Sequence, residues 1–304
     1  MLLYNFASDI KGIPAFEQFV ITDINPLGGT EKRRKIHNPN DPMRILHARL
    51  IRHLRSLPVD LQYATGARPG SSPVRNVARH RENRHFYLLD IQSAYQNVNG
   101  QRLAEVLCSQ DPILIDQEEQ VYQFLAQFCL DPLGGLAIGA PASPDLFNIY
   151  CGVLIDQLLG DLCQQYGLIY TRYLDDLTFS SSGDPIGKRK RRTIRGIFGA
   201  AGFTVNHQKS GVFDLAKGPI VINGVGLELG GRLYLPRHFL RKIRGLLNLA
   251  WKSPSSVDPD LIYGLMGVFW AIAHLRRSFT TTERKLFELY QRVHQLYRYQ
   301  GRAA

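Results

Sequence analysis

The sequence IYTRYLDDLTFSS at residues 169–181 decides the fold. It holds two runs of β-forming residues, 169–173 and 177–181, separated by Leu174-Asp175-Asp176. This arrangement predicts a β-hairpin with two acidic side chains at its tip. Adjacent aspartates in a loop are ordinarily a solvated surface feature, so their chemical meaning depends on which other acids the fold brings beside them.

A third aspartate lies near the end of an apolar run. Residues 85–91, HFYLLDI, predict a short buried strand that carries Asp90 close to its end. If this strand and the hairpin are neighbours in one sheet, Asp90, Asp175 and Asp176 converge at one edge. Clustered carboxylates repel one another and are costly to desolvate, and bound divalent cations remove that cost. Because hard oxygen ligands suit Mg²⁺, the pattern predicts a magnesium site.

The rest of the chain mixes helical and strand patterns, which predicts the α+β class. A second hairpin is expected from residues 221–229 and 232–235 around Gly230-Gly231. After Pro236 the pattern is helical, with a break at 253–256. We therefore predict a domain boundary near residue 235. Helices are expected at residues 48–57, 101–109, 117–130, 144–166 and 188–201.

Charge and composition narrow the class of partner. The 304-residue chain has a formal net charge of +11, which favours a polyanion, either nucleic acid or an acidic membrane surface. Residues 231–304 carry 13 Lys/Arg and 4 Asp/Glu, the composition of a module that grips a nucleic-acid backbone. The four cysteines lie in apolar stretches without a C-x-x-C pair and predict reduced core thiols.

Targeting signals are not evident in the sequence. The N-terminus lacks the pattern of a signal peptide, and the most apolar stretch, residues 261–275, is too short to span a bilayer. We therefore expect a cytoplasmic protein without a membrane partner.

Five blocks of sequence resemble reverse transcriptases, and bacterial retron enzymes in particular. Residues 170–180 resemble the Y-x-D-D block. Four other blocks lie before and after it, and all five occur along the chain in the order of that family. The other four are residues 90–95, residues 139–144 with Asn148, residues 202–206 with Lys209, and residues 222–225 with the primer-grip segment 232–237. The resemblance implies a right-hand polymerase with fingers and an RRM-like antiparallel-sheet palm in residues 1–235, and a helical thumb in residues 236–304.

The resemblance also implies roles at the acidic cluster. Asp90 and Asp175 would be the main ligands of two Mg²⁺ ions, for which Mn²⁺ is a possible substitute, with Asp176 in support and the carbonyl of Ile91 as a further ligand. Such ions activate a 3′-hydroxyl and stabilise the leaving pyrophosphate. Tyr95 matches the aromatic steric gate that rejects a ribose 2′-hydroxyl; the alternative is a core tyrosine.

Further residues match positions that bind the nucleotide. Lys32 and Arg34 resemble the fingers residues that grip the triphosphate, although a solvated basic loop would read the same way. Gly139 and Pro141 belong to the block at residues 139–144. Lys209 could act on the leaving pyrophosphate, and its alternative is a surface lysine.

A last group matches positions that bind nucleic acid. Asn76 and His80 resemble a retron-associated N-A-x-x-H segment, and a structural pair is the alternative. Ser143 and Asn148 belong to the block formed by residues 139–144 with Asn148. In the thumb, the candidates are Arg237, Arg241, Lys242 and Arg244.

Three positions depart from the family pattern. Ile138 replaces the glutamine of L-P-Q-G, Leu174 stands where retron enzymes have alanine, and Ile222-Asn223-Gly224 stands for V-T-G. Another group of defence-associated bacterial reverse transcriptases therefore stays open beside the retron type. A chain of this length is not expected to hold a maturase, endonuclease or RNase H domain as well.

The implied function is an RNA-directed DNA polymerase that extends a DNA or RNA primer with dNTPs. It would copy a specific non-coding RNA in a retron-like antiphage system, in which an effector protein is a further expected partner. Two alternatives stay open: a template-independent or protein-primed DNA polymerase of a defence system, and a non-catalytic RNA-binding scaffold.

Overall fold

The computed structural model describes residues 6, 8–23 and 32–300. Helices and short sheets mix along the chain, so the predicted α+β class is confirmed. The chain forms two compact units. Unit 1 comprises residues 1–69, 88–177 and 187–211, and unit 2 comprises residues 70–87, 178–186 and 212–304. This division does not test the predicted boundary near residue 235, which stays a prediction.

A four-stranded sheet carries the predicted acids. Its strand order is β4 (Ile169–Tyr173), β5 (Asp176–Ser181), β3 (His85–Asp90) and β6 (Gly211–Asp214). The predicted hairpin and the predicted strand ending at Asp90 are both confirmed, and β3 adjoins β5 directly. The hairpin turn consists of Leu174 and Asp175, and Leu174 adopts a left-handed backbone with φ of 56°.

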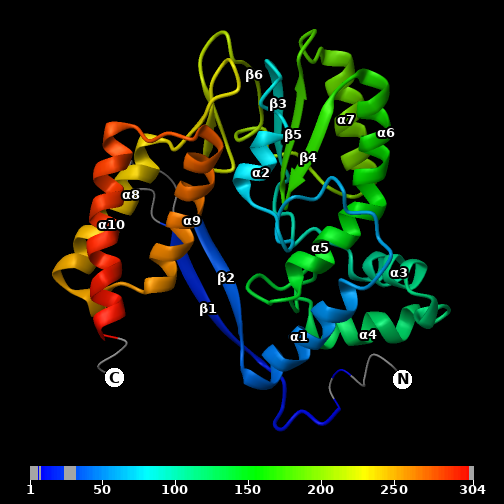
Figure 1. Ribbon diagram of the computed structural model, residues 1–304. Coiled ribbons are helices and arrows are strands. Elements are labelled where there is room, and N and C mark those ends of the chain that lie inside the picture. Colours follow the sequence, from blue (N-terminus) through cyan, green and yellow to red (C-terminus); the bar gives the residue numbers. More distant parts are fainter. Residues whose placement is uncertain (1–5, 7, 24–31, 301–304) are drawn as a thin grey trace. The chain divides into compact units, whose positions relative to one another are not determined.

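Unit 1 also contains a long β-ribbon and most of the helices before residue 201. In the ribbon, β1 (Phe16–Asp23) and β2 (Lys32–Pro39) pair antiparallel along their whole length (Figure 1). Helix α1 begins earlier than predicted because Asn40 caps its first turn. The helices of unit 1 are α1 (Asp41–Leu54), α3 (Gly100–Gln110), α4 (Glu118–Phe128), α5 (Ser143–Cys151), α6 (Gln157–Tyr166) and α7 (Lys188–Ala200), with the short turn η2 (Pro112–Leu114).

The helix predicted over residues 144–166 is interrupted. Between α5 and α6 the chain forms one π-helical turn, η3 (Gly152–Asp156). Gly152 lies in this turn, where a Cβ atom would come within 2.7 Å of the Leu61 side chain. After the turn, α6 packs on β4 and on α7 (Figure 1). The π turn changes which side chains of the helix face the sheet, because it inserts an extra residue into the helical repeat.

The same helix has the length and apolar composition of a membrane span. Of its most apolar window, 67% is buried inside the protein. Burial of this kind is also found in the core helix of a soluble protein, so the segment is weak evidence of a membrane span. Its neighbours in unit 1 account for its apolar character.

Unit 2 is helical after residue 236, as predicted. Its helices α8 (Arg237–Lys252), α9 (Pro259–Arg276) and α10 (Thr281–Gln300) pack together, and η4 (Pro254–Ser256) marks the predicted break (Figure 1). The short helix α2 (Pro73–Ala78) also belongs to this unit.

The second predicted hairpin, around Gly230-Gly231, is confirmed as the antiparallel pair β8 (Val225–Leu227) and β9 (Leu233–Tyr234). A further strand, β7 (Ile220–Ile222), extends it to a three-stranded meander. The strand predicted over residues 221–229 is wrong because Asn223 and Gly224, with φ of 48° and 80°, form a tight turn inside it. An Asn-Gly pair favours such a turn, since both of its residues tolerate positive φ.

The thiols match their prediction. All four cysteines are free and buried. Burial raises the pKa of the Cys129 and Cys151 thiols to about 12, so both stay protonated and inert at neutral pH.

Candidate active site

Backbone hydrogen bonds join the two acidic segments of unit 1. The N–H of Ile91 donates to the carbonyl of Asp175 across 2.9 Å, immediately after Asp90 in the chain. Asp90 itself lies at the end of β3 and is 7% exposed. The predicted convergence of Asp90 with the hairpin tip is therefore confirmed.

The predicted block at residues 202–206 lies against the block at residues 90–95. Ile91 forms an antiparallel bridge with Val205, and the carbonyl of Asp90 accepts from the N–H of Asn206 across 2.8 Å. This pairing brings Lys209 to the acids, where its ammonium contacts Asp90 Oδ2 at 2.8 Å. Lys209 is therefore an ion-pair partner of the acidic cluster and more than an isolated surface lysine.

Electrostatics of the cluster are those of acids held together. Burial raises the pKa of Asp175, a backbone hydrogen bond lowers it, Asp90 raises it, and Lys209 and Arg34 lower it. The hydrogen bond to Asp90 raises the pKa of Lys209, which therefore stays positively charged at neutral pH. The negative charges of Asp90 and Asp175 thus lie together in a partly buried position. A further positive charge beside that of Lys209 would be favourable there.

Tyr95 lies beside the same cluster. Burial, and then the charge of Asp175, raises the pKa of its hydroxyl. Its ring packs edge-on against Phe147 with a centroid distance of 5.2 Å. A half-buried ring beside the acids is compatible with the predicted gate, which stays a prediction.

The predicted block at residues 139–144 packs against the β-ribbon. Gly139 has φ of 96°, and a Cβ atom there would lie 2.9 Å from the carbonyl oxygen of His37. Pro141, two residues after Gly139, is half-buried. Arg34 lies on β2, is exposed, and acts electrostatically on Asp175. The side chain of Lys32 lies outside the described residues.

Two residues of the block formed by residues 139–144 with Asn148 cannot contact nucleic acid as predicted. Ser143 is completely buried and donates to the carbonyl of Ala137 across 2.7 Å. Asn148 is 1% exposed and donates to the carbonyl of Gly66 across 3.0 Å. Their side chains are committed to the interior of unit 1, and the prediction of direct contact is wrong for both.

The retron-associated pair in unit 2 requires the same correction. Asn76 and His80 are both 0% exposed. Asn76 donates to the side chain of Asn223 across 2.6 Å, and His80 Nδ1 lies 2.6 Å from the Ser180 hydroxyl. These two residues are therefore structural, and Asn76 ties the segment that resembles N-A-x-x-H to the segment that stands for V-T-G.

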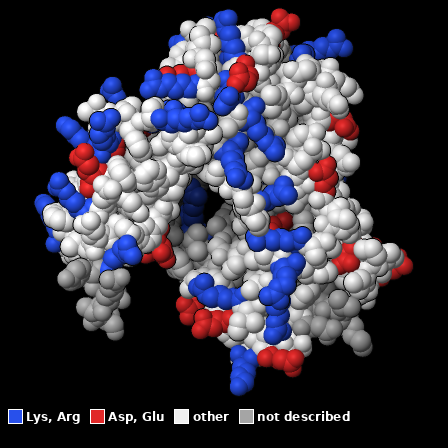
Figure 2. All heavy atoms as spheres, in the orientation of Figure 1, with Lys and Arg blue, Asp and Glu red and all other residues white. Residues whose placement is uncertain are grey.

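The thumb candidates lie on one helix of unit 2. Arg237, Arg241, Lys242 and Arg244 are all exposed on α8, whereas Ile243 of the same helix is buried. Figure 2 shows Lys and Arg side chains over much of the face drawn, with fewer Asp and Glu. This distribution is compatible with the predicted contact to a nucleic-acid backbone.

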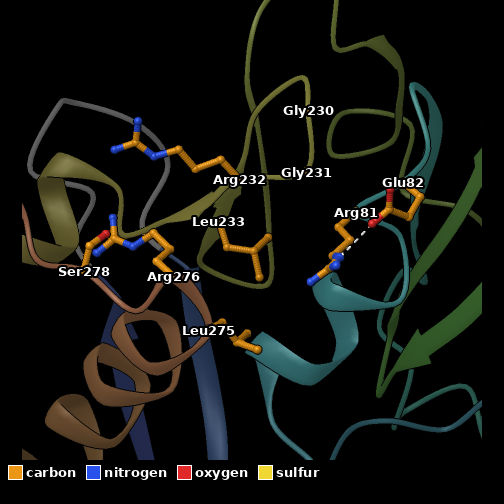
Figure 3. Close-up of a pocket in the computed structure, with 9 residues that line it drawn as sticks. All are labelled: Arg81, Glu82, Gly230, Gly231, Arg232, Leu233, Leu275, Arg276 and Ser278. Atoms are coloured by element: carbon orange, nitrogen blue, oxygen red, sulfur yellow. Dashed lines mark hydrogen bonds and ion pairs between the residues drawn. The ribbon is translucent and has the colours of Figure 1, made fainter.

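A pocket of about 370 Å³ in unit 2 is lined by Arg232 and Leu233 of the predicted primer-grip segment and by none of the individually named site residues (Figure 3). Arg81 and Arg276, which line it, each have a carboxylate partner, Glu82 at 2.8 Å and Glu283 at 2.5 Å. We assign this pocket no role.

Three further residues beside the turn were missed. Arg172 and Asp156 form a buried ion pair, and Gly66 lies so close to the turn that a Cβ atom would come within 2.8 Å of the Leu174 nitrogen. An arginine inside an otherwise apolar strand was a readable signal of a buried pair. Nothing local in the sequence could identify its partner.

The acids fit a divalent cation that also binds substrate. Among the described residues, no group of three or more His, Cys, Asp or Glu side chains is arranged to hold a metal by itself. Mg²⁺ is commonly held by one or two carboxylates, with phosphate oxygens of the substrate completing its shell. Asp90 and Asp175 supply hard oxygen donors of that number and kind.

The model of the reverse transcriptase (RNA-dependent DNA polymerase) family matches residues 25–218. The chain belongs to the reverse transcriptase family. Its relatives include the retron Mx65 reverse transcriptase of Myxococcus xanthus, 30% identical over 59% of this chain and 44% of the relative. The retron Ec83 reverse transcriptase of Escherichia coli is 26% identical over 69% of each chain. The resemblance to bacterial retron-type reverse transcriptases is thus confirmed.

Solved structures show the fold of this family member. Telomerase from Candida tropicalis, solved in complex with a TWJ fragment of telomeric RNA, matches with a TM-score of 0.51 and 13% identity over 89% of this chain and 55% of that chain. The predicted right-hand polymerase fold is therefore confirmed. This chain matches 44% to 69% of the length of these relatives.

Proposed function

We propose that this reverse transcriptase is an RNA-directed DNA polymerase that extends a DNA or RNA primer with dNTPs. The observation that carries the proposal is the convergence of Asp90 with Asp175, joined through the Ile91–Asp175 hydrogen bond and bordered by Lys209. A scaffold that only binds RNA has no use for carboxylates held together at a cost in desolvation.

In the proposed mechanism, Asp90 and Asp175 would hold magnesium, with Asp176 in support and the Ile91 carbonyl as a further ligand. When bound, two Mg²⁺ ions, or Mn²⁺ in their place, would supply activation of the 3′-hydroxyl and stabilisation of the leaving pyrophosphate. Lys209, which contacts Asp90, would bind the leaving pyrophosphate. Its raised pKa keeps it protonated, so it can stabilise the leaving group or donate a proton to it.

Other residues of unit 1 select and orient the nucleotide. Arg34 on β2 binds the triphosphate, because a guanidinium matches the geometry of phosphate oxygens. Gly139 and Pro141 form the wall of the nucleotide site. Tyr95 lies under the sugar and excludes a 2′-hydroxyl.

The C-terminal helices form the thumb, residues 236–304, and residues 1–235 form the fingers and palm. The exposed cations of α8, Arg237, Arg241, Lys242 and Arg244, contact primer or template phosphates. The template is a specific non-coding RNA of a retron-like antiphage system, which works with an effector protein in the cytoplasm. The named relatives, which are retron reverse transcriptases, support the retron-like part of this proposal.

Sequencing the products tests the activity. The protein purified with its bound nucleic acid should extend a primer with dNTPs, and the product should be complementary to one RNA. A product whose sequence is independent of any RNA would instead support template-independent or protein-primed synthesis. The double variant Asp175→Asn/Asp176→Asn should lose synthesis and keep RNA binding; undiminished incorporation by that variant would refute the mechanism.

A further inference from the structure

Arg172 is a charged residue in the interior of unit 1. It lies on β4, two residues before the turn, and its side chain is 0% exposed. Its guanidinium binds Asp156, which is 1% exposed, through Nη2–Oδ2 at 2.7 Å and Nε–Oδ1 at 2.9 Å. A buried ion pair is weak evidence for stability, because apolar side chains of similar volume often stabilise a fold as well or better. Its presence therefore calls for another explanation.

The third nitrogen of the guanidinium reaches the turn that carries Asp175. Arg172 Nη1 donates to the carbonyl of Leu174 across 3.3 Å and to Asn148 Oδ1 across 2.9 Å. Leu174 is the residue with left-handed backbone geometry. This geometry is uncommon and unfavourable for a non-glycine residue, so contacts around the turn must stabilise it. One rigid group thus joins the helical layer to the turn.

A second contact holds the turn from its other side. Asn148 donates to the carbonyl of Gly66, and the Gly66 backbone approaches Leu174 closely enough to exclude a Cβ atom. The segment before Gly66 runs beside β4: the Arg172 N–H donates to the Tyr63 carbonyl at 2.8 Å, and the Thr65 N–H donates to the Arg172 carbonyl at 2.7 Å. Backbone and side chain of Arg172 therefore brace the same turn.

Asp156 is itself held in place. It is the last residue of the π turn η3, and the Tyr170 hydroxyl donates to its Oδ1 atom across 2.7 Å. A π turn within a helix is frequently associated with a functional site. Here it places a carboxylate where the guanidinium of β4 can use it.

The same guanidinium borders the predicted nucleotide site. Its central carbon lies 5.6 Å from the centroid of the Phe147 ring, and that ring contacts Tyr95 edge-on. Displacement of Arg172 would therefore disturb the support of both Asp175 and Tyr95.

We propose that Arg172 is a positioning residue for polymerisation: anchored by Asp156, it holds the Leu174 carbonyl and Asn148 and so determines where Asp175 lies relative to Asp90. The proposal rests on the proposed polymerase function. Arg172 does not contact substrate in this role, and it acts through the turn.

The test compares two buried ion pairs. The double variant Arg172→Met/Asp156→Leu removes both charges together, so no unpaired charge stays buried and the fold should persist. Its control is Arg276→Met/Glu283→Leu, a second pair of low exposure, in unit 2. We expect kcat for dNTP incorporation to fall by about tenfold or more in the first variant and by less than about twofold in the control, with unchanged affinity for template and primer.

A conservative variant covers the possibility that the double variant does not fold. Arg172→Lys keeps the charge beside Asp156, but an ammonium on a flexible chain cannot reproduce the planar fork that reaches three partners. Its kcat should fall as well, while the melting temperature stays close to that of the wild type. A wild-type kcat in either folded variant overturns the proposal, and so does an equal loss in the control.

Hydrogen exchange separates this proposal from the proposed function. The Ile91 amide, which donates to Asp175, should exchange faster in Arg172→Lys and in the double variant than in the wild type and the control. Unchanged exchange at Ile91 overturns the positioning role even if the wild type shows no polymerase activity. Absence of activity in the wild type, with the exchange difference present, refutes only the proposed function.

Discussion

The backbone N–H of Ile91 donates to the carbonyl of Asp175 across 2.9 Å. Because Ile91 directly follows Asp90, this one hydrogen bond fixes the separation of the two chain segments that carry the acids. The carboxylates are thus brought together by the backbone of unit 1 before any substrate binds. Such preorganisation reduces the free energy that the site must spend on rearrangement during the reaction.

Replacing Asp175 should separate activity from stability. Asp175→Asn removes a carboxylate whose pKa is raised by burial, which means that its charged form destabilises the fold at neutral pH. We expect dNTP incorporation to fall by about three orders of magnitude, equivalent to ~4 kcal/mol, and the melting temperature to rise. Asp184→Asn, in an exposed loop, is the control and should change neither. A lower melting temperature for Asp175→Asn would contradict the inference that the charged Asp175 carboxylate destabilises the fold.

Gly66 should be required for the geometry of the turn. In Gly66→Ala, the new Cβ atom would meet the Leu174 nitrogen at 2.8 Å, so the turn or its neighbour must move. We expect a loss of kcat of about tenfold or more and a destabilisation of about 1–3 kcal/mol, measured by steady-state kinetics and urea unfolding. Gly196→Ala on α7 is the matched control: nothing lies within 4 Å of its Cβ position, and alanine should stabilise that helix by up to about 1 kcal/mol. Equal kcat in both variants would show that the turn tolerates displacement.

Tyr95 should determine the choice of sugar. If its ring lies under the incoming nucleotide, Tyr95→Ala opens space for a 2′-hydroxyl and raises the ratio of ribonucleotide to deoxynucleotide incorporation by about tenfold or more. Tyr95→Phe keeps the ring and should keep the preference. Competition between the two nucleotide types on one template measures the ratio. An unchanged ratio in Tyr95→Ala would identify Tyr95 as a core residue that only supports Phe147.

The sequence predicted the acidic centre because local pattern and chain order both bear on it. Two β-forming runs around Asp175 and Asp176 leave a hairpin as the simplest structure. The order of the blocks then placed Asp90 beside that hairpin. The Asn223-Gly224 turn was also readable from the residues, and the strand drawn through it ignored a strong hairpin signal.

Other features depend on packing between distant segments. The π turn that presents Asp156 to Arg172 leaves no local signature, since residues 144–166 read as one helix. Likewise, Asn76 and His80 match a family segment, but only the fold shows that both side chains face inward, toward Asn223 and Ser180. A motif identifies which residues matter, and burial decides whether they contact substrate or support the structure.

The cations of α8 should control the salt dependence of nucleic-acid binding. Arg241→Gln/Lys242→Gln removes two exposed charges, and each lost phosphate contact should lower the slope of log K against log salt by about 0.7–0.9. Affinity measured at several salt concentrations on a primer–template duplex gives this slope. The control, Lys188→Gln/Arg189→Gln, removes two exposed charges from α7 instead. An equal change of slope in both variants would mean that α8 has no special part in binding.

His80 should make the protein acid-sensitive. Burial lowers its pKa from the ordinary 6.5 to about 3, so below pH 6.5 the unfolded chain gains a proton at this position that the folded chain does not. Stability should therefore fall as pH decreases from about 6.5 toward 3, by up to about 1.4 kcal/mol per pH unit from this residue. His80→Gln removes the proton uptake and should flatten this part of the curve, although loss of the Ser180 contact lowers stability at neutral pH. Urea unfolding at several pH values measures the slope. His238→Gln, at an exposed position on α8, should keep the wild-type slope, and an unchanged slope in His80→Gln would assign the acid sensitivity to other groups.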